Sequence, residues 1–409
     1  METETIVRRN GNRVKRPKAE APAVISAQPA LAEIVEKAIP KIIYVSRVTG
    51  EHFESQEALH QHYSECRHVS WNQMVVTPEF QNYIPAPPRS KESLRSTYQQ
   101  NDELTVNSWW AEWKANKIEN WKSFDILKNS VMSEHPKWAY RPCIIAGSGP
   151  SLKRNAQHLL NRKGIGMVSC LHNFGFFHDM GIRPDYYLNL DAGDITIPEM
   201  SQGGGKGEDY YWDASAEYTL VTALHCNPKL HKKWKGKILW FDTALQGMNE
   251  AIEAECPGIR DLNVFFQTGG NTLGASHYLA KAVLGANPLI FVGADLSFSH
   301  DRKFHPFDSP YDKQFAGVVP CTDVFGYRVA TWPSYFGFKT WFEHMALGGL
   351  GNRPGTYINA TEGGILGAYP EGNMMQIPQR RLAEVITEYT MHDVMPKIVA
   401  DKTKIMSLY

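Results

Sequence analysis

Paired cysteines are missing from this sequence of 409 residues. Its six cysteines are widely spaced, and no two of them form a CxxC pair. They are Cys66, Cys143, Cys170, Cys226, Cys256 and Cys321. Disulfide-stapled folds and zinc ribbons need closely spaced cysteines, so this pattern excludes both classes and favours a reducing compartment.

Long apolar runs and an excess of one charge sign are missing as well. No run approaches the ~18 apolar residues that a membrane helix needs, and the polar N-terminus lacks the pattern of a secretion signal. Lysine plus arginine and aspartate plus glutamate both number 43, so the formal net charge is zero. Whole-chain charge therefore gives no reason to expect nucleic-acid or membrane binding. We expect a cytoplasmic protein without membrane contact.

The composition is that of a globular protein, and one stretch in it carries the clearest pattern. Hydrophobic residues make up 43% of the chain and charged residues 21%, which suits a substantial core. The stretch 143–155, CIIAGSGPSLKRN, predicts a buried strand, a glycine-rich turn and a helix. The turn consists of Gly147, Ser148, Gly149, Pro150 and Ser151.

This turn is a candidate phosphate-binding site. Its glycines allow a ligand to approach the backbone, and the start of the following helix favours an anion. The spacing matches neither GxGxxG nor a P-loop. An ordinary tight turn between strand and helix is the alternative.

From residue 139 onward, short apolar runs alternate with helical patterns. Such repeated units predict an α/β fold, with an open, mostly parallel sheet and helices on both faces. Ligands bind at the carboxyl ends of the strands in these sheets. Polar residues and glycines gather at the expected strand ends, although each one taken alone suits a turn: Asn173, Asp191, Asp194, Gly293 and Asp295.

Residues 41–67 resemble a zinc finger with a ββα shape. Four residues fall at the F-x5-L-x2-H-x3-C spacing of such fingers: Phe53, Leu59, His62 and Cys66. Ser46 and Thr49 stand where the first pair of cysteines belongs. Hydroxyl groups are poor zinc ligands, so we expect a metal-free docking module.

Several blocks downstream, taken in order, resemble one family. They include GSGPSL, RPDYYLNLDAGD, the segment from TGGNTLGAS to GADLSFSHDRKFH, and YINATEGGILGA. Together they resemble the MptE-like (6-hydroxymethylpterin diphosphokinase-like) domain family, and above all its motility accessory factor (Maf) branch, which is associated with flagellin glycosylation. The resemblance implies a Rossmann-like domain over residues 139–370.

The resemblance adds one domain to an organisation that the rest of the sequence predicts. Composition and spacing predict a flexible basic arm (1–40), the finger-like module (41–67), a linker (68–100), a helical segment (101–138) and a C-terminal helical extension (371–409), and the resemblance implies the α/β domain (139–370). The arm and the finger-like module are candidate contacts for a protein or nucleic-acid partner.

The resemblance also implies site residues. His305 lies where the Maf branch carries a histidine, and with Asp295 it is the predicted catalytic pair. Nucleotide or phosphate binding is expected at Gly147, Ser148, Gly149, Pro150, Ser151, Asn173, Asp191, Thr268, Gly269, Gly270, Asn271 and Gly293. Glu362 and His300 are candidates for an acceptor site.

Three functions fit these residues. The first is a transferase that moves a sugar of the nonulosonic-acid type from a CMP-linked donor to a hydroxyl of a protein, sugar or pterin. The second is a diphosphokinase that uses ATP, with Mg²⁺ on Asp191 and Asp194. The third is a retired enzyme fold that serves as a binding protein. No zinc is expected, and no other cofactor follows from the sequence.

Overall fold

A computed structural model describes residues 3–7, 13–17, 44–45, 52–53, 91–243, 245, 247–314, 317–346, 357–367 and 377–391. The chain divides into two units, Met1–Lys41 and Ile42–Tyr409. In the first unit, strands β1 (Thr3–Val7) and β2 (Arg13–Pro17) pair antiparallel. The segment predicted as a basic arm therefore contains a two-stranded sheet.

An eight-stranded sheet forms the centre of the second unit, and each of its strands runs parallel to its neighbours. Its strands are β5 (Cys143–Ala146), β6 (Gly166–Cys170), β7 (Tyr186–Asn189), β8 (Thr219–Ala223), β9 (Lys237–Thr243), β10 (Phe265–Phe266), β11 (Leu289–Val292) and β14 (Tyr357–Asn359). The spatial order is β10-β9-β8-β7-β6-β5-β11-β14. The predicted parallel α/β fold is confirmed.

The strand order reverses beside β5. The chain adds β6 to β10 on one side of β5 and then returns to place β11 on the other side. In open parallel sheets, ligands bind outside the carboxyl ends of the strands at such a reversal. The loops that follow β5 and β11 are therefore the expected walls of a ligand site.

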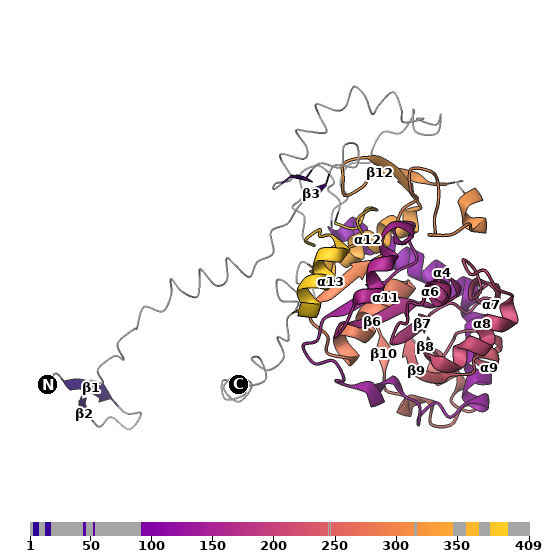
Figure 1. Cartoon of the computed structure of the whole chain (residues 1–409). Coiled ribbons are helices and arrows are strands. Elements are labelled where there is room, and N and C mark those ends of the chain that lie inside the picture. The colour runs from indigo at the N-terminus through magenta and orange to yellow at the C-terminus, as the bar shows by residue number, and fades with distance from the viewer. Residues whose placement is uncertain are drawn as a thin grey trace. The chain divides into compact units, whose positions relative to one another are not determined.

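Helices cover both faces of this sheet (Figure 1). They are α4 (Lys91–Ser123), α5 (Leu152–Asn155), α6 (Phe174–Met180), α7 (Thr196–Glu199), α8 (Glu208–Ala214), α9 (Pro228–Lys233), α10 (Met248–Ile252), α11 (Thr272–Tyr278), α12 (Pro333–Ala346) and α13 (Leu382–Met391). Alternate residues of β5 point to opposite faces, as the pleat requires. Cys143 and Ile145 share a core with α11, whereas Ile144 and Ala146 share one with α5 and α13.

Short 3₁₀ and π turns link these elements. They are η1 (Val131–Glu134), η2 (Ala156–Asn161), η3 (Leu171–Asn173), η4 (Ser215–Glu217), η5 (Ile259–Asp261), the π turn η6 (Leu279–Val283) and η7 (Pro310–Lys313). A separate two-stranded sheet pairs β12 (Val319–Thr322) with β13 (Arg328–Thr331) antiparallel.

Helix α4 differs from the predicted helical segment 101–138. It begins at Lys91, inside the range predicted as a linker, and ends at Ser123. Ile118 and Trp121 pack on a core that contains Trp240. This part of the tryptophan-rich stretch is a packing face, because its apolar side chains contact the sheet.

The structure describes only part of the predicted finger-like module (41–67) and of the predicted C-terminal extension (371–409). Strands β3 (Tyr44–Val45) and β4 (His52–Phe53) pair antiparallel, which is the order of the hairpin in a finger. Leu59, His62 and Cys66 lie outside the described residues, so the finger-like module stays a prediction. Within the predicted C-terminal extension, α13 packs against the core beside β5.

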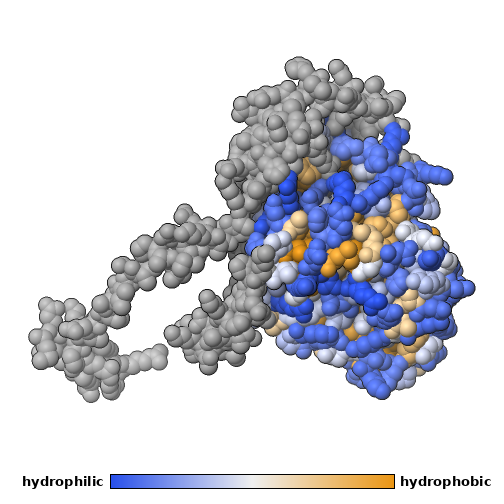
Figure 2. Space-filling model, in the orientation of Figure 1, coloured by the Kyte–Doolittle hydropathy of each residue, from blue (hydrophilic) through white to orange (hydrophobic). Residues whose placement is uncertain are grey.

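On the face drawn in Figure 2, hydrophilic residues predominate around smaller hydrophobic areas. None of the helices in the described residues is both long and apolar enough to cross a membrane.

Candidate functional site

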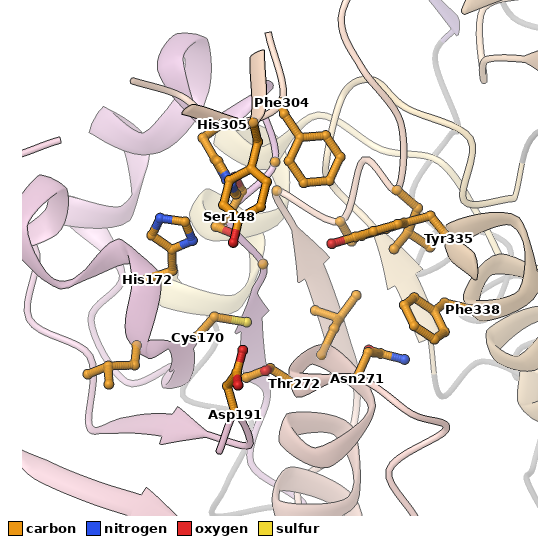
Figure 3. Close-up of a pocket in the computed structure, with 18 of the residues that line it drawn as sticks. Ser148, Cys170, His172, Asp191, Asn271, Thr272, Phe304, His305, Tyr335 and Phe338 are labelled. Atoms are coloured by element: carbon orange, nitrogen blue, oxygen red, sulfur yellow. The ribbon is translucent and has the colours of Figure 1, made fainter. Parts of the chain in front are cut away.

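A cavity of about 410 Å³ lies where the strand order reverses. Its volume is within the range of small-molecule sites, roughly 300–1,000 Å³. Its wall includes the turn after β5 (Gly147, Ser148 and Gly149) and the loop after β11 (Gly293 and Ala294). Figure 3 shows His172, His305 and Phe304 near one end of the cavity, Asp191 and Thr272 near the other, and Tyr335 and Phe338 along one side.

The glycines of the turn allow two loops to pack closely. The Gly149 amide donates to the Gly293 carbonyl at 2.9 Å. A Cβ on Gly147 would lie 2.4 Å from the Gly293 oxygen, and one on Gly149 would lie 2.1 Å from Oδ2 of Asp295. Any side chain there would displace the loop after β11. These glycines are therefore required by the protein's own packing, in addition to any ligand.

The Asp295 carboxylate stabilises the same turn through hydrogen bonds to Ser151. One carboxylate oxygen accepts the Ser151 hydroxyl at 2.7 Å, and the other accepts the Ser151 amide at 3.2 Å. Asp295 and Ser151 are both buried and do not line the cavity. This geometry makes Asp295 a positioning group for the turn, and not a group within reach of a ligand.

One amide of the turn is left for a ligand. The amides of Gly147, Gly149 and Ser151 donate to protein acceptors, and Pro150 has no amide hydrogen. The Ser148 amide has no hydrogen-bond partner among the residues that the structure describes. Of the predicted phosphate cradle, only Ser148 keeps a backbone donor available.

Asn173 lies under the turn. Its side-chain Nδ2 donates to the Gly147 carbonyl at 2.7 Å and to Ser169 Oγ at 3.2 Å. The residue is fully buried and does not line the cavity. Asn173, predicted to bind a nucleotide or phosphate, therefore supports the backbone of the turn.

His305 is brought to the cavity wall, as predicted. Its Nδ1 donates to the Ser148 carbonyl at 2.8 Å, which leaves the lone pair of a neutral ring on Nε2. This Nε2 is buried and has no partner among the described residues. The His172 ring lies 4.2 Å from the His305 ring, centroid to centroid. Burial, then the nearby His172, lowers the pKa of His305 to about 3, so the ring is neutral at pH 7.

Two carboxylates line the cavity, Asp191 and Glu199. Glu199 is the last residue of α7, and its carboxylate accepts the Tyr311 hydroxyl at 2.9 Å. Burial, which outweighs the Tyr311 hydrogen bond, raises the pKa of Glu199 to about 7. Asp191 Oδ1 accepts the Gly193 amide at 2.8 Å. The residues that line the cavity include no lysine or arginine that could pair with either carboxylate.

The predicted magnesium pair does not assemble in the cavity. Asp194 pairs with Lys229 at 2.7 Å and lies on the surface, away from the cavity lining that includes Asp191. The hydrogen bonds from Lys229 and Asn227 lower the pKa of Asp194. Among the described residues, no group of three or more His, Cys, Asp or Glu side chains could hold a metal ion. Magnesium stays a prediction, and these two carboxylates together do not fit it.

The second predicted anion site is brought to the cavity only in part. Gly270 and Asn271 line the wall, whereas Thr268 and Gly269 do not. The Asn271 side chain is the N-cap of α11 and accepts the Gly274 amide at 2.8 Å. Its amide oxygen is therefore engaged by the helix.

The two predicted acceptor residues lie outside the cavity. His300 is exposed, with Nε2 3.7 Å from Asp323. The Glu362 carboxylate accepts the Leu382 amide at 2.9 Å at the start of α13, and its carbonyl accepts a hydrogen bond from Arg154. Glu362 therefore joins two loops of the fold.

Sequence reasoning missed the groups that close the cavity on the aromatic side. These are His172, Glu199, Tyr311, Ser334, Tyr335 and Phe338. They come from η3, α7, η7 and α12, which are far apart in the chain. The one available signal was the cluster of aromatic residues around YFGFKTWF, which follows the predicted catalytic loop.

The fold and the site define a parallel α/β protein with a ligand cavity at the reversal of its strand order. Residues 114–301 match the model of the family described as 6-hydroxymethylpterin diphosphokinase MptE-like. Residues 114–301 therefore match the MptE-like family, as the motifs predicted.

One solved structure that this chain matches in part is that of MAf glycosyltransferase from Magnetospirillum magneticum AMB-1, at 17% sequence identity and a TM-score of 0.47. The match covers 67% of this chain and 38% of that protein's chain, so this chain spans well under half of its length. A comparison with curated proteins finds no match.

Proposed function

We propose that this chain is a transferase that moves a group from a nucleotide-activated donor to a hydroxyl of an acceptor. The observation that carries the proposal is the His305 side chain, which lines a 410 Å³ cavity at the reversal of the sheet and whose Nε2 has no hydrogen-bond partner among the described residues. The fold directs ligands to this position. Residues 114–301 match a family whose description names a diphosphokinase, and this match supports transfer chemistry.

His305 contacts the acceptor hydroxyl in this proposal. Its Nδ1–H is committed to the Ser148 carbonyl, so the ring cannot turn without breaking that bond. Nε2 then accepts a hydrogen bond from the hydroxyl and orients its oxygen toward the donor. The same Ser148 offers its backbone amide to a phosphate oxygen, which brings acceptor and donor to one side of the turn.

The donor of this proposal is a nucleotide-linked sugar, with a CMP-linked nonulosonic acid as the specific candidate. Tyr335, Phe338 and Phe304 supply aromatic faces, and Asp191 supplies an exposed carboxylate to the same cavity. Aromatic faces and carboxylates suit a sugar or a ribose with several hydroxyls.

A second candidate is the ATP-dependent diphosphokinase of the family description. The cavity favours it in one respect, because the carboxylates of Asp191 and Glu199 both line it and oxygen ligands suit Mg²⁺. The pairing of Asp194 with Lys229 counts against the metal site first expected. A third candidate is a retired fold that binds without turnover.

The test of the proposal compares two histidine variants in a transfer assay with nucleotide-linked donors. We expect His305→Ala to lower turnover by about 10²-fold, with nucleotide affinity nearly unchanged, because the ring orients the acceptor. His300→Ala is the matched control, since His300 is exposed and outside the cavity. Equal turnover in both variants would contradict the role of His305. Turnover that a chelator abolishes would favour the diphosphokinase.

A further inference from the structure

Glu199 and Tyr311 form a hydrogen-bonded pair on the cavity wall, apart from the glycine turn. Glu199 ends α7, and Tyr311 belongs to η7, more than a hundred positions later in the chain. The 2.9 Å contact joins the Tyr311 hydroxyl to Oε1 of Glu199. The Tyr311 ring also lies 5.5 Å from the His305 ring, centroid to centroid. The pair therefore faces the same part of the cavity as His305.

The groups around Glu199 are acidic or neutral. Asp191 adds a negative charge from the end of β7, and Tyr335 faces it from α12. Burial, then the neighbouring Glu199, raises the pKa of Tyr311 well above its usual range, so its hydroxyl keeps its proton and donates. His172 and His305 are neutral at pH 7, because burial lowers their pKa values to about 4 and about 3.

His305 is therefore a poor final acceptor for a proton. A charge on its ring would be buried and would lie beside a second histidine. Glu199, by contrast, has a pKa of about 7, which suits proton exchange at neutral pH. Its remaining hydrogen-bond capacity is open to the cavity, since Tyr311 is the one partner of its carboxylate among the described residues.

We propose that Glu199 is the general base of the transfer, and that Tyr311 positions its carboxylate. The inference rests on the proposed function. In the step, the acceptor hydroxyl turns its hydrogen from His305 Nε2 to the Glu199 carboxylate, its O–H bond breaks, and the proton moves to that carboxylate. The acceptor oxygen forms a bond to the transferred group, and the bond from that group to the donor's phosphate oxygen breaks. The phosphate leaves with the electron pair, and Glu199 later gives its proton to water.

A pH profile of turnover tests this role, because only the carboxylate form can accept the proton. In the wild type, kcat/KM should rise with pH through an apparent pKa near 7. Glu199→Gln should lower turnover by about 10²–10⁴-fold and remove that limb of the profile. Its nucleotide affinity should change by less than about 3-fold, since the base acts mainly in the transition state.

Tyr311→Phe is the second variant. The Tyr311 hydrogen bond lowers the pKa of Glu199, so its loss should move the limb upward by about one pH unit. Turnover above that limb should fall by less than about 10-fold, because the base itself remains. A merely structural role for Tyr311 would lower the rate without moving the limb.

Glu217→Gln is the matched control, because Glu217 is an exposed carboxylate outside the cavity that pairs with Arg183. It should leave both turnover and the limb unchanged. If the wild type turns over and Glu199→Gln turns over at the same rate, the role of Glu199 is wrong, while the proposed function stands. Nucleotide binding without transfer to any hydroxyl acceptor would overturn the proposed function, and the base with it.

Discussion

The raised pKa of Glu199 has a consequence for stability that does not depend on turnover. Its pKa is about 7 in the folded protein and near 4.5 for an ordinary glutamate, so the folded state holds more protons between these values. The contribution of protonated Glu199 to the free energy of unfolding is therefore fully present below about pH 4.5 and is lost as the pH rises through 7.

Replacing Glu199 by Gln removes this loss. The stability of Glu199→Gln relative to the wild type should increase by about 2–3 kcal/mol between pH 4 and pH 8. Urea unfolding of both proteins at several pH values measures the difference. A difference that stays constant across this range would mean that Glu199 titrates like an exposed carboxylate.

Gly149 is the residue at which the turn tolerates a side chain least. An added Cβ would lie 2.1 Å from the Asp295 carboxylate and 2.7 Å from the Gly293 oxygen. We expect Gly149→Ala to lower the free energy of unfolding by about 1–3 kcal/mol. Gly207→Ala is the control, because nothing lies within 4 Å of its added Cβ and its φ is −68°. Equal stability of the two variants would show that the loop after β11 yields freely.

At the scale of elements, a buried ion pair joins α4 to the sheet. Lys117 Nζ lies 2.7 Å from the Asp242 carboxylate at the end of β9, and both side chains are 0% exposed. Asn249 also accepts from Lys117 at 2.8 Å and donates to Asp242 at 2.9 Å. Each polar group of this cluster depends on the others, since all three residues are buried.

Lys117→Met should therefore destabilise the protein by about 3–5 kcal/mol, because it leaves the Asp242 charge buried without its cation. Lys114→Met, one turn earlier on α4, is the control. Lys114 pairs with Glu255 at 4.0 Å on the surface, so its loss should cost less than about 1 kcal/mol. Thermal unfolding of both variants measures the difference, and similar losses would contradict a special role for the buried pair.

At the scale of the whole molecule, the sequence predicted the sheet because each strand is a short apolar run between turn residues. Parallel strands buried on both faces carry this pattern within themselves. The reversal beside β5 was not predicted, because the order of strands depends on contacts between distant segments. The two strands that flank the cavity, β5 and β11, lie more than 140 positions apart.

The same limit applies to the site. Gly147, Ser148, Gly149, Asp191, Gly270, Asn271, Gly293 and His305 were predicted and do line the cavity. Asp295 and Asn173 were predicted as ligand contacts, yet they support the turn, and the bond from Ser151 to Asp295 spans 144 positions. Glu199 was not predicted, because its environment comes from Tyr311, 112 positions away.

The central claim is that this cavity binds a nucleotide-linked donor. A thermal-shift screen with CMP, CDP, UDP and ATP, each with and without Mg²⁺, tests it most directly. A ligand at about 100 times its dissociation constant adds about 2.7 kcal/mol of stability, a rise of about 3–5 °C in Tm for a protein of this size. Ser334 is an exposed residue of the cavity wall on α12, so Ser334→Trp should abolish the shift by narrowing the cavity.

Thr387→Trp is the matched control, since Thr387 is an exposed hydroxyl residue on α13 and does not line the cavity. The account predicts a shift with at least one nucleotide, kept in Thr387→Trp and lost in Ser334→Trp. A shift kept in both variants would place the nucleotide elsewhere. Wild-type protein that shows no shift with any of these nucleotides, with or without Mg²⁺, would contradict the claim that this cavity serves a nucleotide-dependent transferase.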